Sequence, residues 1–189
     1  SLWSAHNDLN YFEIAYALNR QFGEGGIYES EGLYNFVDNH DVERIASQLS
    51  EPAHLYPLHL LHFTMPGVPS IYYGSEWGIE GRKRDGDWGL RPTFDRPWRG
   101  EGRPHPHLGE ALRAFARLRR DSEALRRGDY RELHVSAEQF AFSRSVSDET
   151  VIVAVNGSAE RSRLELPIDA RAPRCYVDQL DPHRAYVVE

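Results

Sequence analysis

Cysteine, lysine and long apolar runs are nearly missing from this chain of 189 residues. Its single cysteine, Cys175, cannot form a disulfide within the chain. No apolar run approaches the roughly 20 residues of a membrane span, and no signal-peptide pattern is visible. Acidic residues outnumber basic ones, for a formal net charge of -7. Since nucleic-acid phosphates require a basic face, the chain is not expected to bind nucleic acid. Without an apolar span it is not expected to bind a membrane either. A cytoplasmic location is slightly favoured.

The length allows a substantial core but not a complete (β/α)8 barrel, which takes roughly 250 residues. Apolar residues make up 40% of the chain and charged residues 27%, as in soluble globular proteins. Aromatic residues cluster before residue 100, which fits a sugar site because ring faces stack on pyranose faces. For any single aromatic, a place in the core is the stronger expectation.

The first half alternates between helical and strand patterns. Apolar residues at helical spacing predict helices at 10–21, 42–49 and 55–63, and short apolar runs predict strands at 33–37 and 70–73. This alternation is typical of a parallel α/β architecture. The long segment 75–106 is rich in glycine and proline and carries Trp77, Trp88 and Trp98, which favour an ordered, functional loop.

The pattern changes after an amphipathic helix predicted at 107–127. Beyond Gly128 the apolar residues recur with period two, as at Phe140 and Phe142, and a hairpin turn is expected at 147–149. Further strands are predicted at 150–155, 163–166, 175–180 and 185–188. The predicted domains are therefore 1–128, an α/β unit, and 129–189, a small antiparallel β domain.

One stretch carries most of the chemistry. The apolar run before Asp38 ends abruptly in Asp38, Asn39, His40 and Asp41, as in a buried strand that delivers polar side chains to a site at its carboxyl end. In (β/α) barrels the catalytic groups lie at that end of the strands. Glycoside chemistry, however, needs more carboxylates than this stretch supplies.

With these residues in place, the chain resembles the alpha-amylase family of glycoside hydrolases. Residues 36–41 match the last of the family's conserved catalytic segments, on its seventh barrel strand, and 67–76 look like its eighth strand and the following loop. Residues 91–95 resemble an Arg-Pro-Met-x-Trp-Asp element, with Thr93 and Phe94 as departures. Leu118-Arg119 and 124–128 resemble the last barrel helix leading into the C-terminal β domain.

The resemblance implies the fold and what the chain lacks. It implies the C-terminal portion of a (β/α)8 TIM barrel followed by a small antiparallel β domain, truncated at its end. The family's aspartate nucleophile and glutamate acid/base lie on the fourth and fifth strands, which would precede Ser1. The chain is thus expected to be an inactive fragment of a retaining enzyme that hydrolyses or transglycosylates alpha-linked oligosaccharides or polysaccharides.

The resemblance also assigns roles to the motif. Asp41 is implied to bind the sugar 2- and 3-hydroxyls in the −1 subsite and to stabilise the transition state, and His40 to donate to the same hydroxyls. A helix cap on the segment from Val42 is the alternative for Asp41. Asn39 is either a direct ligand or a residue that positions the pair. Asp38 is expected to shape the loop.

Residues around the motif are expected to form its surroundings. Tyr72, Tyr73 and Glu76 are expected to be scaffold and rim. Outer sugar subsites are expected from Trp77, Trp88, Asp85 and Arg91. The oxygen-rich Asp85-Gly86-Asp87 is too short for a calcium cage, so a solvated turn is expected. No cofactor is predicted in this segment; the family's calcium site depends on regions upstream.

Other classes of function stay open at this point. A non-catalytic, amylase-like binding or scaffold protein is the main alternative, although the intact Asn39-His40-Asp41 argues against it. An independent carbohydrate-binding module in 129–189 ranks last because its strands show few aromatic residues for a sugar face. Since an open third of a barrel leaves strand edges uncovered, self-association of the fragment is also expected.

Overall fold

The computed structural model describes residues 1–28, 32–93, 104–168 and 175–187. Its helices are α1 (Leu2–Asn7), α2 (Phe12–Phe22), α3 (Ile45–Gln48), α4 (Leu55–Thr64), α5 (Asp87–Leu90), α6 (Leu108–Asp121) and α7 (Glu123–Arg127), with 3-10 turns η1 (Pro52–His54), η2 (Ser75–Trp77) and η3 (Lys83–Asp85). Its strands are β1 (Tyr34–Phe36), β2 (Val68–Ser70), β3 (Asp129–Val135), β4 (Gln139–Ser145), β5 (Thr150–Asn156), β6 (Cys175–Val177) and β7 (Ala185–Val187).

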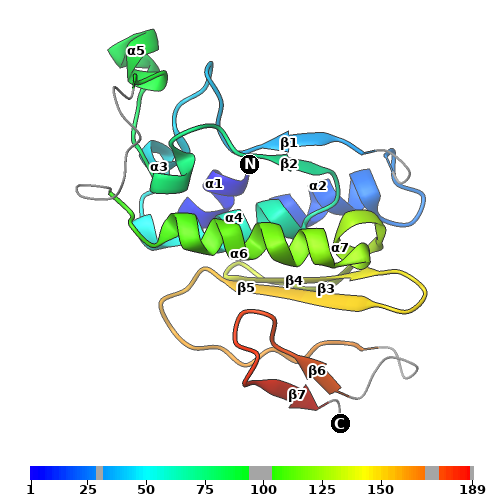
Figure 1. Cartoon of the computed structure of the whole chain (residues 1–189). Coiled ribbons are helices and arrows are strands. Elements are labelled where there is room, and N and C mark those ends of the chain that lie inside the picture. Colours follow the sequence, from blue (N-terminus) through cyan, green and yellow to red (C-terminus); the bar gives the residue numbers. More distant parts are fainter. Residues whose placement is uncertain (29–31, 94–103, 169–174, 188–189) are drawn as a thin grey trace.

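The elements form layers. A central layer of helices lies between the parallel pair β1–β2 and the antiparallel sheet β3–β4–β5, and the small β6–β7 hairpin lies beyond that sheet (Figure 1). In the parallel pair Tyr34, Asn35 and Phe36 face Val68, Pro69 and Ser70. Because parallel strands run the same way, the loops after β1 and after β2 meet at one edge.

The predicted helices and strands are confirmed in most places, and the differences have local causes. The strand expected at 70–73 lies instead at Val68–Ser70, directly after Gly67, so the prediction is wrong for 71–73. Gly67 has φ +102°, and a Cβ there would lie 2.3 Å from Asn35 Nδ2, so only glycine allows this approach. The single helix expected at 107–127 is broken at Ser122, whose Oγ accepts the Leu125 N–H at 3.0 Å and starts α7.

In the second half of the chain one predicted strand is wrong and one predicted turn is confirmed. The strand predicted at 163–166 is wrong, because those residues take no regular structure or ladder partner in the described part of the chain. The hairpin turn at 147–149 is confirmed, with the Val146 N–H donating to the Glu149 carbonyl at 2.9 Å. The division into two domains at Gly128 stays a prediction.

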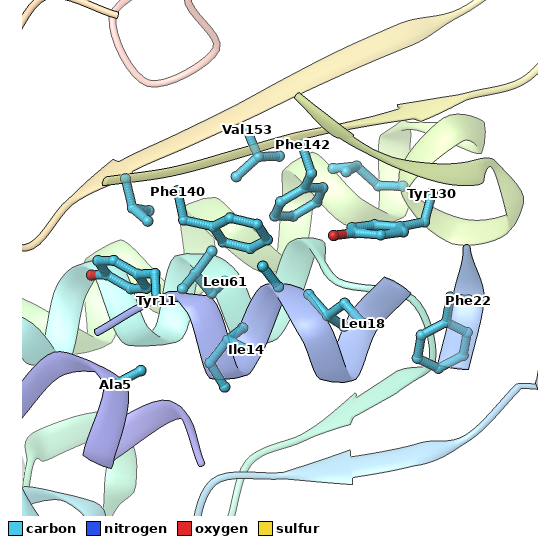
Figure 2. Packing of buried hydrophobic residues seen from close by; sticks show 13 residues of the cluster. Ala5, Tyr11, Ile14, Leu18, Phe22, Leu61, Tyr130, Phe140, Phe142 and Val153 are labelled. Atoms are coloured by element: carbon cyan, nitrogen blue, oxygen red, sulfur yellow. The ribbon is translucent and has the colours of Figure 1, made fainter. Parts of the chain in front are cut away.

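One hydrophobic cluster joins the two halves of the sequence. Phe140 and Phe142 of β4 are fully buried and point at Leu18 of α2 and Leu61 of α4 (Figure 2). Burial of aromatic side chains of this size contributes roughly 3–5 kcal/mol each, measured by truncation to alanine. The sheet β3–β4–β5 is therefore packed on the helices that precede it.

The other face of the molecule leaves apolar side chains in solvent. On the parallel pair Tyr34 is 68% exposed, Phe36 45% and Val68 54%. Exposed apolar surface of this kind marks a contact site or an association hazard. Self-association stays a prediction. No helix in the described ranges is long and apolar enough to cross a membrane.

Buried histidines make this core sensitive to acid. His59 of α4 is fully buried, and neither ring nitrogen has a hydrogen-bond partner among the described residues. Burial lowers the pKa of His59 to about 3, with the neighbouring His62 adding to the shift. Burial likewise lowers the pKa of His6 to about 4. Both rings are therefore neutral in the folded protein at pH 5.

We expect the free energy of unfolding to fall as the pH drops below about 6.5. The unfolded chain binds protons at its histidines near pH 6.5, whereas folded His59 does not until about pH 3, so the unfolded state gains protons first. His59→Leu should remove up to about 1.4 kcal/mol per pH unit from this slope near pH 5. Urea denaturation between pH 7.5 and 5 measures it.

The control is His183→Leu. His183 is exposed, so its surroundings are aqueous in the folded and unfolded states, and this variant should keep the wild-type slope. An unchanged slope in His59→Leu would contradict the assignment of the acid sensitivity to this ring.

Candidate active site

Asp38 anchors the loop that follows β1. Its side chain is buried, at 1% exposure, and both carboxylate oxygens are used. Oδ1 accepts the Ser75 hydroxyl at 2.7 Å, and Oδ2 accepts the Ile45 N–H at 3.0 Å. Asp38 thereby ties the end of β1 to the turn after β2 and to the first residue of α3.

Arg44 completes this anchor as the buried cation. Its Nε lies 3.6 Å from Asp38 Oδ2, and its side chain is 0% exposed. The guanidinium donates to the Tyr73 carbonyl and lies over the Tyr72 ring, 4.6 Å from the ring centroid. A Cβ on Gly74, which has φ +87°, would lie 2.8 Å from Arg44 Nη2, so the turn after β2 is shaped around this guanidinium.

Asn39 holds the next turn of the same loop. Its Oδ1 accepts the backbone N–H groups of Asp41 at 2.8 Å and Val42 at 3.1 Å, which is an Asx turn. This bond pattern fixes the backbone at Asp41. A direct contact of Asn39 with a ligand stays a prediction.

Asp41 presents its carboxylate to solvent at the carboxyl edge of the parallel pair. His40 Nε2 lies 3.1 Å from Asp41 Oδ2, and Arg91 Nη2 lies 3.3 Å from Asp41 Oδ1. The side chains of His40 and Asp41 are 57% and 64% exposed. Each carboxylate oxygen thus faces one nitrogen atom, while most of the group stays accessible to a ligand.

Arg91 connects a distant loop to this cluster. Its Nε donates to the His40 carbonyl at 3.2 Å, and its Nη1 lies 3.5 Å from Asp87 Oδ2. The Tyr73 hydroxyl donates to the Pro92 carbonyl at 3.1 Å, so the same loop also contacts the end of β2. Partial burial raises the pKa of Tyr72 beside this contact, and its hydrogen bond with Tyr73 raises it further.

The helix-cap alternative for Asp41 is wrong. The helix expected from Val42 begins only at Ile45, and the carboxylate that accepts its first N–H belongs to Asp38. The Asp41 side chain is thereby left for His40, Arg91 and solvent. Asp38 shapes the loop, as expected from the sequence.

Of the other predicted subsite residues, Trp77 is the half-buried last residue of η2, and its role stays a prediction. Trp88 and Asp85 lie on the loop around α5, which projects from one end of the molecule (Figure 1). Trp88 on α5 is 79% exposed, and Asp85 faces Arg84 at 3.8 Å. The contacts that join this loop to Asp41 run through Arg91, and the roles of Trp88 and Asp85 as subsites stay predictions. The described ranges contain no cluster of three or more side chains suited to a metal ion. Phe94, Asp95 and Trp98 lie outside the described residues.

Arg44 is the residue of this site that the sequence pattern did not single out. An arginine inside a polar segment is ordinarily a solvated residue, and Arg44 follows Glu43 directly. The signal that could have identified it is its place directly before the buried Ile45, at the point where the chain turns back into the core. Its partner Asp38 lies six residues earlier, beyond any helical spacing.

The chain is similar in sequence to known proteins. The family model described as the alpha-amylase catalytic domain matches residues 15–146. Neopullulanase 2 from Thermoactinomyces vulgaris is 31% identical over 156 residues, which cover 80% of this chain and 25% of that protein. Cyclomaltodextrinase from Geobacillus thermopakistaniensis is 30% identical over 172 residues, which cover 88% of this chain and 28% of that protein.

A solved structure agrees in three dimensions. Cyclic alpha-maltosyl-(1→6)-maltose hydrolase from Arthrobacter globiformis aligns with a TM-score of 0.68 and 26% identity, over 82% of this chain and 34% of that one. The structural neighbours are (β/α)8-barrel enzymes, and the parallel pair with its helices is consistent with part of such a barrel. The chain belongs to the alpha-amylase family of glycoside hydrolases. It spans about a quarter of the length of the two curated relatives.

Asp38→Asn should destabilise the protein by about 3 kcal/mol. The amide keeps an acceptor for the Ile45 N–H but leaves the Arg44 guanidinium buried without a countercharge, and uncompensated buried charges cost about 3–5 kcal/mol. Urea denaturation followed by tryptophan fluorescence gives the free energy of unfolding.

Asp41→Asn is the matched control, because it makes the same chemical change three residues along on an exposed side chain. It should change the free energy of unfolding by less than about 1 kcal/mol, as is usual for exposed ion pairs. Equal destabilisation by the two variants would contradict the anchor role of Asp38.

Proposed function

We propose that this chain is the part of an alpha-glucan-active retaining glycosidase that carries the transition-state-stabilising carboxylate, Asp41. The observation that carries the proposal is the exposed Asp41 carboxylate beside His40, at the carboxyl edge of a parallel strand pair in an alpha-amylase family chain. The names of the relatives, neopullulanase and cyclomaltodextrinase, support alpha-linked glucose oligomers and polymers as the substrate class.

The geometry suits the chemistry of a glycosyl transition state. A carboxylate oriented by Arg91 can accept hydrogen bonds from two adjacent sugar hydroxyls. Those bonds strengthen as the ring flattens and positive charge develops, so they lower the barrier and not only the dissociation constant. His40 supplies a donor to the same hydroxyls.

Arg91 has a role in this proposal that differs from a simple sugar contact. It binds both the His40 carbonyl and the Asp41 carboxylate, so it fixes the two residues relative to each other. Asn39 fixes the same backbone from the other side. We assign both as positioning residues of the −1 subsite.

The chemistry also needs two carboxyl groups about 5 Å apart, one as nucleophile and one as acid/base. Among the described residues, Arg91 pairs with two carboxylates, Asp41 and Asp87. Asp87 is exposed, and its ion pair with Arg91 does not make it a nucleophile or an acid/base. We propose that the nucleophile and the acid/base come from a longer protein. Whether that protein hydrolyses or transfers depends on residues outside this chain.

The isolated 189-residue chain should not turn over maltooligosaccharides or cyclomaltodextrins. Stabilising a transition state without a nucleophile or proton donor leaves the glycosidic bond intact. Reducing-sugar release by the purified chain, compared with buffer alone, measures this. Turnover that follows the chain through repurification and is lost in Asp41→Asn would contradict it.

In the longer protein, Asp41→Asn should lower kcat by about 10²–10³ with little change in KM. The reason is that the lost hydrogen bonds are stronger in the transition state than in the bound substrate. Steady-state kinetics on maltotriose gives both parameters. Asp121→Asn is the control, since Asp121 is an exposed aspartate paired with Arg120 at the end of α6, outside the proposed site.

The alternative, a non-catalytic amylase-like binding protein, makes a different prediction for the same experiment. A longer protein that binds maltooligosaccharides but shows no turnover before mutation supports the binding protein. A loss confined to KM in Asp41→Asn would mean uniform binding and would also count against the proposed role.

A further inference from the structure

A cavity of about 640 Å³ lies at the end of the parallel pair opposite to Asp41. Gly67 and Val68, where β2 begins, line it, whereas Asp41 follows the end of β1. The other walls come from Phe22 at the end of α2, from α6 and α7, and from the first residues of β3. The cavity is therefore separate from the candidate active site.

The walls of this cavity concentrate positive charge in an acidic protein. Four arginines line it, Arg119, Arg126, Arg127 and Arg144, against two carboxylates, Glu24 and Asp129. None of the four arginines makes an ion pair within 4.0 Å with another of the described residues. The chain as a whole has a formal net charge of -7, so the excess of positive charge around this cavity is opposite in sign to the charge of the whole chain.

Two of the guanidinium groups are fixed in place by backbone carbonyls. Arg144 is 2% exposed, and its Nε and Nη2 donate to the Gly128 carbonyl while Nη1 donates to Thr64. Arg119 donates through Nη1 to the carbonyls of Phe63 and Met65 and through Nη2 to Gly67. Each guanidinium has five N–H donors, so two on each group have no acceptor among the described residues.

These two cations are also electrostatically uncompensated. Burial, together with the nearby Arg119, lowers the pKa of Arg144 to about 10, against a weaker opposing effect of Asp129. Backbone carbonyls satisfy hydrogen bonds but do not neutralise charge. An anion in the cavity would do both, because it accepts the remaining N–H donors and cancels the repulsion between the two groups.

We propose that this cavity binds a small organic molecule through a phosphate group. Guanidinium groups recognise phosphate with paired N–H donors, and a dianion matches arginines that converge from α6, α7 and β4. Arg126 and Arg127 are exposed in the last turn of α7 and line the rim of the cavity, where they would contact the ligand. The volume lies within the range of small-molecule pockets and exceeds what a lone phosphate ion fills.

Glycerol 3-phosphate, inorganic phosphate and glycerol are the probes. Isothermal titration of the full chain at pH 7.5, with ionic strength held constant by sodium chloride, should show binding of glycerol 3-phosphate, weaker binding of inorganic phosphate and none of glycerol. The bound anion should also raise the melting temperature of the chain, because it binds the folded state alone.

Three variants test the site without disturbing Arg119 and Arg144, whose guanidinium groups are fixed by backbone carbonyls. Arg126→Gln with Arg127→Gln should weaken glycerol 3-phosphate binding at least tenfold. Glu24→Gln should strengthen it about two- to fivefold, because it removes a carboxylate that repels the anion. Arg117→Gln, an exposed arginine of α6 outside the cavity, is the matched control and should stay within twofold of wild type.

Several results would overturn the proposal. Absence of binding at about 10 mM glycerol 3-phosphate would mean that a group of the protein itself satisfies the arginines. Unchanged affinity in the double arginine variant would place the anion elsewhere. Equal affinity for inorganic phosphate and glycerol 3-phosphate would contradict the proposal that the cavity binds an organic molecule and not phosphate alone. None of these results bears on Asp41, so the proposed function stands or fails separately.

Discussion

The buried ion pair between Asp38 and Arg44 is the interaction on which the candidate site depends. Asp38 binds Ser75 and the first N–H of α3, and Arg44 binds the Tyr73 carbonyl and packs on Tyr72. The pair therefore joins the loops after both parallel strands within one buried network. Because a buried charge without its partner is costly, the two loops are stable only in this arrangement. The exposed His40 and Asp41 lie on the loop that this buried network holds in place.

The parallel pair separates two chemical environments. Its carboxyl edge presents an exposed carboxylate and imidazole, and its amino edge opens on a cavity lined by arginines. The helices between them are held by a core that also includes β4, so Phe140 and Phe142 stabilise the same layer that carries the site. The proposed sugar site and the proposed anion site therefore lie at opposite ends of the parallel pair.

Much of the candidate site could be predicted from the sequence because it follows one local rule. An apolar run that ends in Asp38-Asn39-His40-Asp41 is typical of a barrel strand, and the family resemblance supplied the roles. The contribution of Arg91 as a bridge to Asp41, 50 residues away, could not be predicted, since nothing in local spacing specifies which carboxylate a loop arginine meets. The same holds for Arg44 and for Ser122, which splits a helix that is continuous in its periodicity.

The sequence by itself determined the family, the alternation of helix and strand in the first half, and the edge at which polar groups gather, because these depend on periodicity and on contiguous motifs. Only the tertiary structure decided which of two neighbouring aspartates is buried. Asp38 and Asp41 are chemically identical and three residues apart, yet Asp38 accepts the Ile45 N–H and pairs with Arg44, while Asp41 faces solvent. The physical reason is that burial of a carboxylate requires a cation and hydrogen-bond donors converging from other segments, and that convergence exists only in the folded chain.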